Sequence, residues 1–222
     1  MPYTIQEVKK ALLCCARVLE EKKERLTEID SRIGDGDLGS SMQKGMQALS
    51  LSVQNSQGDN IARMLMDGGI ALNTAAPSTM GTLLSAALLD LAKVWKGKTE
   101  LTAEELAAVP RILAESISRK GNAKRGDKTI LDALFPYAEA FEAEFVRSGS
   151  LPYAAAAGAH AAWEGVEQTR SMQARAGRAR WLGEKSRATE DGGAVLCALL
   201  GEGLLDLAED GSLDRVPSKA VL

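Results

Sequence analysis

The sequence predicts an all-α protein, a single eight-helix antiparallel up-and-down bundle. Apolar residues recur at three- and four-residue steps over most of the chain, and β-branched residues are too sparse to form a convincing strand. The connections are short or medium in length, so consecutive helices are expected to pack antiparallel. No linker rich in Pro, Gly or Ser divides the chain. We therefore expect one domain over residues 1–210 and a C-terminal tail over 211–222.

The first four helices follow from apolar stripes and from residues that start helices. Their expected ranges are about 5–19, 42–53, 61–73 and 77–95. Thr4 and Glu7 form a capping-box pair at the start of the first stripe. The pair Gly68-Gly69 weakens the third helix, because glycine costs helix stability. Pro77-Ser78-Thr79 starts the fourth, where a proline and a capping hydroxyl are both favourable.

The last four helices are predicted in the same way. Their expected ranges are about 102–119, 130–145, 152–174 and 192–209. Thr102 and Glu105 form a second capping-box pair, and Pro110 is expected to kink the helix that follows. Pro136 is a second expected kink. The helix after it is rich in alanine.

Composition and charge exclude several classes of function. The chain has 222 residues, with 27 Lys+Arg against 30 Asp+Glu and a net charge of −3, whereas binding of bulk nucleic acid needs a basic surface. No apolar run approaches the roughly 20 residues that span a bilayer. The N-terminal MPYTIQEVKK lacks the apolar stretch of a signal peptide. We expect a cytoplasmic protein with no membrane or nucleic-acid partner.

Cysteine and histidine offer little chemistry. Cys14, Cys15 and Cys197 have no CxxC spacing and predict neither a disulfide framework nor a zinc site. The single histidine, His160, excludes multi-histidine metal sites. Its place in the alanine-rich helix favours a packed or surface residue over a catalytic base.

Three carboxylates are the strongest candidates for chemistry. Asp30, Asp35 and Asp37 lie within eight positions of a glycine-rich connection between two predicted helices. Three acids in one turn repel one another unless a cation lies between them. Oxygen ligands without His or Cys suit a hard ion, above all Mg²⁺ when phosphates complete its shell. The alternative explanation is that Asp and Gly are ordinary turn formers.

Three known patterns resemble this segment. Gly34-x-Gly36-x-x-Gly39 matches the dinucleotide pattern GxGxxG, but that motif follows a strand and a helix is expected here. A calcium loop is rejected because its twelfth position, which needs a bidentate Glu, is Met46. Asp35-x-Asp37 also resembles the paired aspartates of phosphatases that form an aspartyl-phosphate, and this alternative stays open. No GxxxxGK[ST] sequence is present.

Other connections carry matching chemistry. Ser78 and Thr79 place hydroxyls and free N–H groups at a helix start, which attracts anions, although simple N-capping explains one hydroxyl. Residues 121–129 form a second polar, glycine-bearing loop, and 191–193 open the last helix. A basic cluster, which is more often a solvated face than a phosphate site, comprises Arg170, Arg175, Arg178, Arg180, Lys185 and Arg187.

Three motifs stand in order along the chain. They are Asp30-x4-Asp35-Gly36-Asp37-x-Gly39, then Gly126-Asp127-Lys128-Thr129 with Asp132-Ala133-Leu134, then Met172-Gln-Ala-x-x-Gly177-Arg178-Ala179-x-x-Leu182-Gly183-Glu184-x-Ser186. In these motifs the sequence resembles the L (DhaL-type) subunit of dihydroxyacetone kinases. The resemblance spans almost the whole chain.

The resemblance implies an eight-helix barrel that binds ADP or ATP at one end through two Mg²⁺ ions. The implied metal ligands are Asp30, Asp35 and Asp37. The implied nucleotide-binding residues are Leu38, Gly39, Ser40, Ser41, Ser78, Thr79, Gly121, Ile130, Arg178, Asp191, Gly192 and Gly193. No catalytic residue is implied, because the metal and nucleotide site carries the transfer and the sugar is held on a histidine of a separate K subunit.

The chain departs from the family pattern at a few positions. Leu38 stands where the family usually has His, and Ser41 where it has Asn. The loop at 75–79 is shorter than the family's Gly/Ser-rich loop. Thr189-Glu-Asp191-Gly192-Gly193 replaces His-x-Asp-Pro-Gly.

The expected main partner is the sugar-binding K subunit, and a homodimer is left open. One alternative is a subunit whose bound ADP is rephosphorylated by a phosphohistidine protein of the sugar phosphotransferase system. Another is a non-catalytic sensor that binds a regulator through its exposed helices. No residue is well placed by type to deprotonate a sugar hydroxyl, so the isolated chain is expected to be inert toward sugar.

Overall fold

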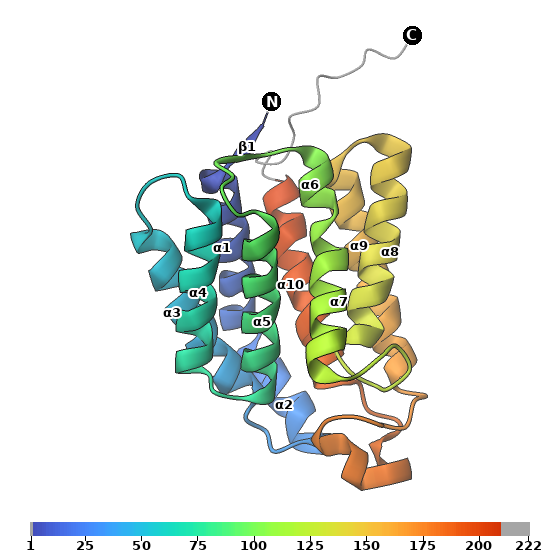
Figure 1. The fold of residues 1–222 in the computed structure, drawn as a ribbon. Coiled ribbons are helices and arrows are strands. Elements are labelled where there is room, and N and C mark those ends of the chain that lie inside the picture. The colour runs from blue at the N-terminus through green and yellow to red at the C-terminus, as the bar shows by residue number, and fades with distance from the viewer. Residues whose placement is uncertain (1, 210–222) are drawn as a thin grey trace.

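Ten α-helices, two short strands and one 3₁₀ segment make up residues 2–209, the part of the chain that this computed structural model describes (Figure 1). The predicted tail over 211–222 lies outside the described residues. The α-helices are α1 Ile5–Glu21, α2 Lys23–Ile33, α3 Leu38–Asn55, α4 Ile61–Ala75, α5 Thr79–Val94, α6 Ala103–Ala107, α7 Val109–Gly121, α8 Leu131–Ser148, α9 Leu151–Thr169 and α10 Gly192–Glu209. The remaining elements are β1 Tyr3–Thr4, β2 Glu100–Leu101 and the 3₁₀ segment η1 Arg178–Ser186.

The all-α prediction is confirmed, but the described residues form ten helices rather than eight segments. The segment before Gly34 is helical, as expected, but α2 was not predicted as a separate helix because its sequence, KERLTEIDSRI, buries only Leu26, Ile29 and Ile33. The helix predicted over 102–119 is two helices, because the chain breaks at Ala108 before Pro110, where only a kink was expected.

Other boundaries also differ from the prediction. Helix α8 contains Pro136, as its predicted range did, but ends at Ser148 rather than near residue 145, and α9 ends at Thr169 rather than near residue 174. The strands β1 and β2 pair antiparallel, with Tyr3 opposite Leu101. Each strand has only two residues, which is too short for an alternating pattern to show in the sequence.

Eight of the described helices pack side by side as a closed ring. The order around it is α1, α3, α4, α5, α7, α8, α9, α10 and back to α1. Their axes run along the length of the molecule in Figure 1. Four connections therefore meet at one end of the ring, at the bottom of Figure 1: α2–α3, α4–α5, α7–α8 and α9–α10.

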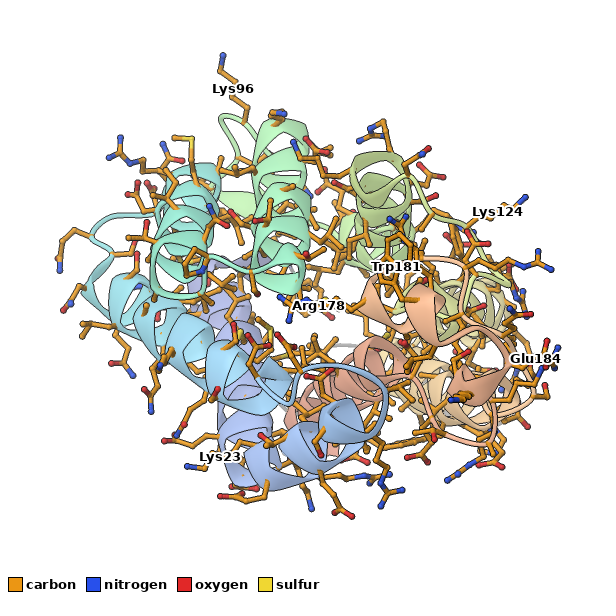
Figure 2. All side chains as sticks on the ribbon, turned by 90° about the horizontal axis from the view of Figure 1, so that it is seen from below. Lys23, Lys96, Lys124, Arg178, Trp181 and Glu184 are labelled. Atoms are coloured by element: carbon orange, nitrogen blue, oxygen red, sulfur yellow. The ribbon has the colours of Figure 1, made fainter. Side chains whose placement is uncertain are left out.

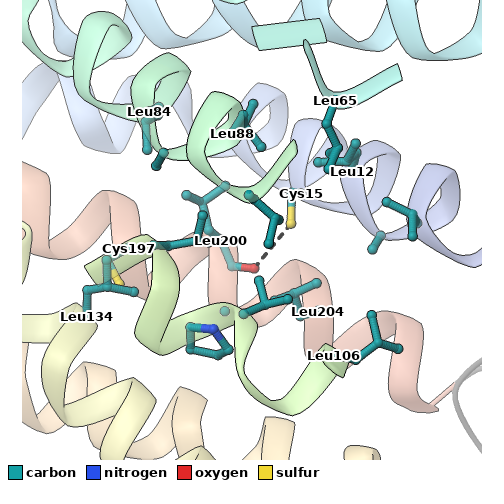
Figure 3. A pocket seen from close by; sticks show the side chains of 18 of the residues that line it. Leu12, Cys15, Leu65, Leu84, Leu88, Leu106, Leu134, Cys197, Leu200 and Leu204 are labelled. Carbon is teal, nitrogen blue, oxygen red and sulfur yellow. Dashed lines mark hydrogen bonds between the residues drawn. The ribbon is translucent and has the colours of Figure 1, made fainter. Parts of the chain in front are cut away.

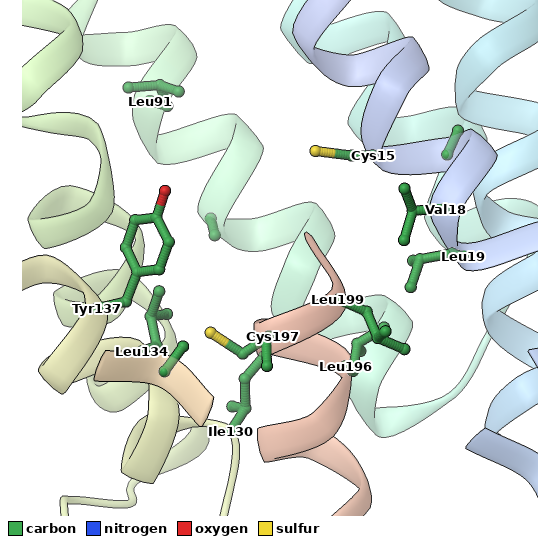
Figure 4. Packing of buried hydrophobic residues seen from close by; sticks show 14 of the residues in the cluster. Cys15, Val18, Leu19, Leu91, Ile130, Leu134, Tyr137, Leu196, Cys197 and Leu199 are labelled. Atoms are coloured by element: carbon green, nitrogen blue, oxygen red, sulfur yellow. The ribbon is translucent and has the colours of Figure 1, made fainter. Parts of the chain in front are cut away.

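The ring is held together by an apolar interior. Figure 4 shows side chains from several helices meeting there, among them Leu19, Leu91, Leu134 and Leu196. Burying a side chain of this size contributes roughly 1.5–3 kcal/mol. All ten helices except α2 also line a cavity of about 250 Å³ whose walls are almost entirely apolar (Figure 3). The interior of the ring therefore offers almost no polar groups to a ligand.

Within residues 2–209, no helix combines the length and the apolar character that crossing a bilayer requires.

Candidate functional site

The three candidate metal ligands converge at the end of the ring where four connections meet. Asp30 comes from the last turn of α2, and not from a loop as the sequence suggested, whereas Asp35 and Asp37 come from the connection to α3. One ligand atom of each carboxylate lies within 4.8 Å of the others. Three hard oxygen donors at this spacing, without His or Cys, fit Mg²⁺ or Ca²⁺.

Local backbone geometry shapes this carboxylate cluster. The Gly34 amide donates to the Asp30 carbonyl at 2.5 Å, and the Leu38 amide donates to the Asp30 carboxylate at 3.3 Å. Gly39 is needed because a Cβ there would collide with the Lys23 carbonyl and the Thr27 hydroxyl of α2. The start of α3 therefore lies directly against α2, which holds the three aspartates in one place.

The segment before Asp35 decides between the open alternatives. It is helix α2, whereas aspartyl-phosphate enzymes and GxGxxG nucleotide sites both require a strand there. The phosphatase alternative is therefore excluded, and the rejection of the dinucleotide pattern is confirmed.

Arg178 reaches the cluster from the connection between α9 and α10. Residues 170–190 of this connection, which include η1, are called the cap segment below. The Arg178 guanidinium forms an ion pair with Asp35 although both side chains are largely exposed. Viewed from this end of the ring, Arg178 points from the cap segment toward the middle of the ring (Figure 2). It adds a positive charge beside three negative ones.

The starts of α3 and α5 also meet here. The Ser41 hydroxyl donates to the Ser78 hydroxyl at 3.2 Å, and Ser78 caps α5 by accepting from the Gly81 amide at 3.1 Å. Ser40 is exposed and donates to the Asp37 carbonyl at 3.0 Å. Thr79 is the exposed first residue of α5. Two helix N-termini with free amides therefore flank the carboxylates, an arrangement that favours phosphate.

The residues 191–193 form a third helix start at the same place. The Asp191 carboxylate accepts from the Ala194 amide at 2.8 Å and so caps α10. A Cβ on Gly192 would lie 2.9 Å from a Leu38 methyl group, and one on Gly193 would lie 3.1 Å from the Ile130 nitrogen. The two glycines thus let α10 start in contact with α3 and with the loop before α8. Desolvation raises the pKa of Asp191 to about 7.

The connection between α7 and α8 forms another wall of the site. The buried Asp132 carboxylate accepts from the Gly126 amide at 2.5 Å and the Thr129 amide at 2.7 Å. Ile130 is buried beside Gly193, while Gly121 lies at the end of α7 against Leu83 of α5.

Lys128 is a residue whose burial the sequence did not indicate. Its side chain is only 1% exposed, and the ammonium donates to the Thr169 and Thr189 carbonyls, each at 2.6 Å. Desolvation lowers the pKa of Lys128, and the nearby Asp191 opposes that shift. A lysine in a polar, glycine-bearing loop is normally solvated, so only the three-dimensional structure reveals that Lys128 is buried.

The basic cluster separates into different environments. Arg170 pairs with Glu167 and Glu190, and Arg187 pairs with Glu184. The Arg180 guanidinium stacks over the Trp181 ring at 4.5 Å. His160 is an exposed residue of α9, 3.8 Å from Glu164. Of the six basic residues, Arg178 is therefore the one that the recorded ion pairs connect to the carboxylates.

Comparison with known proteins places this geometry in context. A family model for the DAK2 domain matches residues 32–206. The chain is 31% identical over 181 residues to the Escherichia coli (strain K12) "PEP-dependent dihydroxyacetone kinase, ADP-binding subunit DhaL", covering 82% of this chain and 86% of that protein. It is 36% identical over 188 residues to a Mycolicibacterium smegmatis "L-erythrulose 1-kinase", covering 83% of this chain and 32% of that kinase.

The fold has counterparts among solved structures. The dihydroxyacetone kinase of C. freundii superposes with a TM-score of 0.70 at 22% identity, covering 90% of this chain and 34% of that chain. Its complex with AMP-PNP and Mg²⁺ gives a TM-score of 0.68, also at 22% identity, covering 93% of this chain and 34% of the other. The chain thus spans most of the DhaL subunit but only about a third of the erythrulose kinase and of the C. freundii kinase.

Proposed function

The chain belongs to the DAK2-domain family, and on that premise we propose that it is the Mg²⁺- and nucleotide-binding subunit of a kinase for dihydroxyacetone or a similar small ketose. The observation that carries this proposal is the meeting of three carboxylates, three helix starts and Arg178 at one end of the ring. The relatives support it, because one is described as ADP-binding and a structure of another contains AMP-PNP and Mg²⁺.

We propose for these groups the roles that the resemblance implies. Asp30, Asp35 and Asp37 would hold two Mg²⁺ ions, which would neutralise phosphate charge and orient the phosphoryl group. The starts of α3 and α5, at 38–41 and at Ser78 and Thr79, would bind the phosphates together with Arg178. Gly121 and Ile130 would flank the adenine and ribose, and 191–193 would close over the nucleotide.

The balance of charge at the site explains why the metal ions, the helix N-termini and Arg178 are all needed. ATP carries about four negative charges and the three carboxylates add three, which gives a total of about seven. Two Mg²⁺ ions would cancel four of these charges. Helix N-termini and Arg178 offset part of the remainder. Phosphoryl transfer needs this neutralisation and an in-line geometry more than covalent help from the protein. The chain can therefore serve the reaction without a catalytic residue of its own.

The acceptor sugar is proposed to come from a separate sugar-binding K subunit. A general base for a hydroxyl must lie within hydrogen-bond reach of it, and His160 is an exposed residue of α9 that pairs with Glu164 of the same helix. Trp181 is 79% exposed on the same segment as Arg178 (Figure 2). Large exposed aromatics beside a reactive site are frequent anchors of protein interfaces. We propose that Trp181 lies in the docking face.

The phosphoryl source has a second candidate. The Escherichia coli relative is described as part of a PEP-dependent kinase, which favours a subunit whose bound ADP is rephosphorylated by a phosphohistidine carrier protein. Slow nucleotide exchange would support this candidate, because the nucleotide then acts as a resident cofactor. Fast exchange would support an ATP-dependent kinase.

Arg178→Gln tests the nucleotide site. The substitution removes charge-assisted hydrogen bonds worth about 1.5–3 kcal/mol, so we expect Mg-ADP affinity to fall roughly 10- to 100-fold. Calorimetry measures the affinity. Arg180→Gln, two residues along the same segment, is the matched control and should leave affinity unchanged. Equal affinities in the two variants would remove Arg178 from the proposed site.

A further inference from the structure

The cap segment is a long connection that must be held in place if Arg178 is to stay near the carboxylates. It joins α9 to α10 and carries Arg178 on η1. Connections of this length are uncommon in compact domains unless they serve a function. The non-helical conformation of Gly183 interrupts η1, so the segment lacks the internal support of a continuous helix. Its position therefore depends on contacts with the rest of the molecule.

Lys128 supplies the central contact between the two ends of this segment. Its ammonium group donates to the carbonyl of Thr169, the last residue of α9, and to the carbonyl of Thr189, just before α10. The last carbonyls of a helix lack partners within the helix and attract positive charge. One buried side chain thus joins the residue that precedes the cap segment to a residue near its far end.

Neighbouring hydrogen bonds also hold the two ends of the cap segment together. The Ala188 amide donates to the Arg170 carbonyl at 2.8 Å, and the Asp191 amide donates to the Thr169 hydroxyl at 2.9 Å. The Arg175 amide donates to the carbonyl of Asp127, the residue before Lys128, at 2.9 Å. The loop that carries Lys128 therefore contacts the cap segment at its base and again close to Arg178.

Burying Lys128 in this conformation costs free energy. An ammonium group loses hydration on burial unless hydrogen bonds replace its water. Lys128 also has a φ of 60°, a left-handed conformation that is uncommon for residues other than glycine and persists only when its surroundings impose it. The two carbonyl contacts of Lys128 therefore act together with the hydrogen bonds from the Gly126 and Thr129 amides to Asp132 in fixing the conformation of this loop.

We propose that Lys128 is a positioning residue, which fixes the cap segment and thereby sets where Arg178 and Asp191 lie relative to the carboxylates. It is not a nucleotide ligand, because its side chain is almost fully buried and both recorded hydrogen bonds go to backbone carbonyls. The consequence for nucleotide binding rests on the proposed function, whereas the closure of the cap segment does not.

The first test is hydrogen exchange in nucleotide-free protein carrying Lys128→Met, which keeps an unbranched side chain and removes the charge. The Ala188 and Asp191 amides should exchange about tenfold faster or more than in the wild type, while the central amides of α8 keep their protection. Lys124→Met is the matched control, since Lys124 belongs to the same loop and its exposed side chain lies at the edge of the molecule (Figure 2).

If Lys128→Met does not fold, Lys128→Gln tests the same closure. Glutamine is shorter and uncharged, so it cannot replace both charge-assisted contacts with the Thr169 and Thr189 carbonyls. Exchange of the Ala188 and Asp191 amides should then rise. Unchanged exchange in whichever variant folds, or a uniform rise across all helices, would overturn the proposal, because a merely stabilising lysine affects every helix alike.

The second test concerns nucleotide release. Lys128→Met should speed Mg-ADP dissociation about tenfold, and by less in a protein that already carries Arg178→Gln, because residues that act through one another are not additive. Equal fold-changes in both backgrounds would contradict a role through Arg178. If the wild type bound no nucleotide, the proposed function would fail, whereas the exchange experiment would still decide whether Lys128 closes the cap segment.

Discussion

Asp35→Asn and Asp37→Asn are each expected to abolish measurable Mg²⁺-dependent ADP binding while leaving the helical content intact. Both side chains are at least partly exposed and lie outside the apolar core, so their replacement removes metal ligands and not packing. Loss of groups that merely orient metal ligands costs about 10–100-fold in affinity, and loss of a direct ligand should cost at least as much. Calorimetry with Mg-ADP and circular dichroism measure the two effects.

Glu28→Gln is the matched control for these variants. Glu28 is an exposed acid of α2, paired with Arg32 and close in sequence to Asp30. Its neutralisation makes the same change in net charge, so it should leave Mg-ADP binding as in the wild type. Near-wild-type affinity in both aspartate variants would show that the carboxylates do not hold the metal.

The isolated chain with Mg-ATP is expected to leave dihydroxyacetone unphosphorylated. The carboxylates described at this end of the ring already have other partners: Asp30, Asp35 and Asp37 are assigned to the metal, Asp191 caps α10, and Asp132 accepts from two loop amides. None is therefore assigned to binding or deprotonating a small polyol. Adding a cognate sugar-binding K subunit should restore transfer, because the phosphoryl group then faces an in-line acceptor. Product formation by the chain alone and with the partner measures this difference.

Trp181→Ala separates docking from nucleotide binding in this experiment. The indole group of Trp181 is exposed, so its loss should reduce partner-dependent transfer by about tenfold or more without changing Mg-ADP affinity. Val146→Ala is the control, since Val146 is also exposed but lies near the C-terminal end of α8, at the opposite end of the helix ring from the carboxylates. Robust sugar phosphorylation by the purified chain alone would overturn the requirement for a partner.

The sequence predicted the parts of the fold that depend on local patterns. Strong apolar stripes placed α3, α4 and α5 close to their observed ranges, and both capping boxes, at Thr4 and at Thr102, are present. Helix α2 was not predicted as a separate helix because it buries only three apolar residues. The break before Pro110 was expected only as a kink, because a proline suits the first turn of a new helix as well as a bend.

The candidate site was predicted as a set of residue types and not as a geometry. Three aspartates near glycines indicated a hard cation, and the structure brings their ligand atoms together. The Arg178–Asp35 ion pair and the Ser41–Ser78 hydrogen bond join residues far apart in sequence, so no local pattern could reveal them. Lys128 shows the same limit, since its sequence neighbours give no sign of burial.

The central claim is that the carboxylate cluster holds the metal through which nucleotide binds, and thermal unfolding with ADP tests it most directly. A ligand that binds only the native state stabilises it by about 2.7 kcal/mol at 100 times its dissociation constant. We predict that ADP raises the melting temperature in the presence of Mg²⁺ and has no such effect once a chelator removes the ion. An equal rise with and without the chelator would contradict the claim.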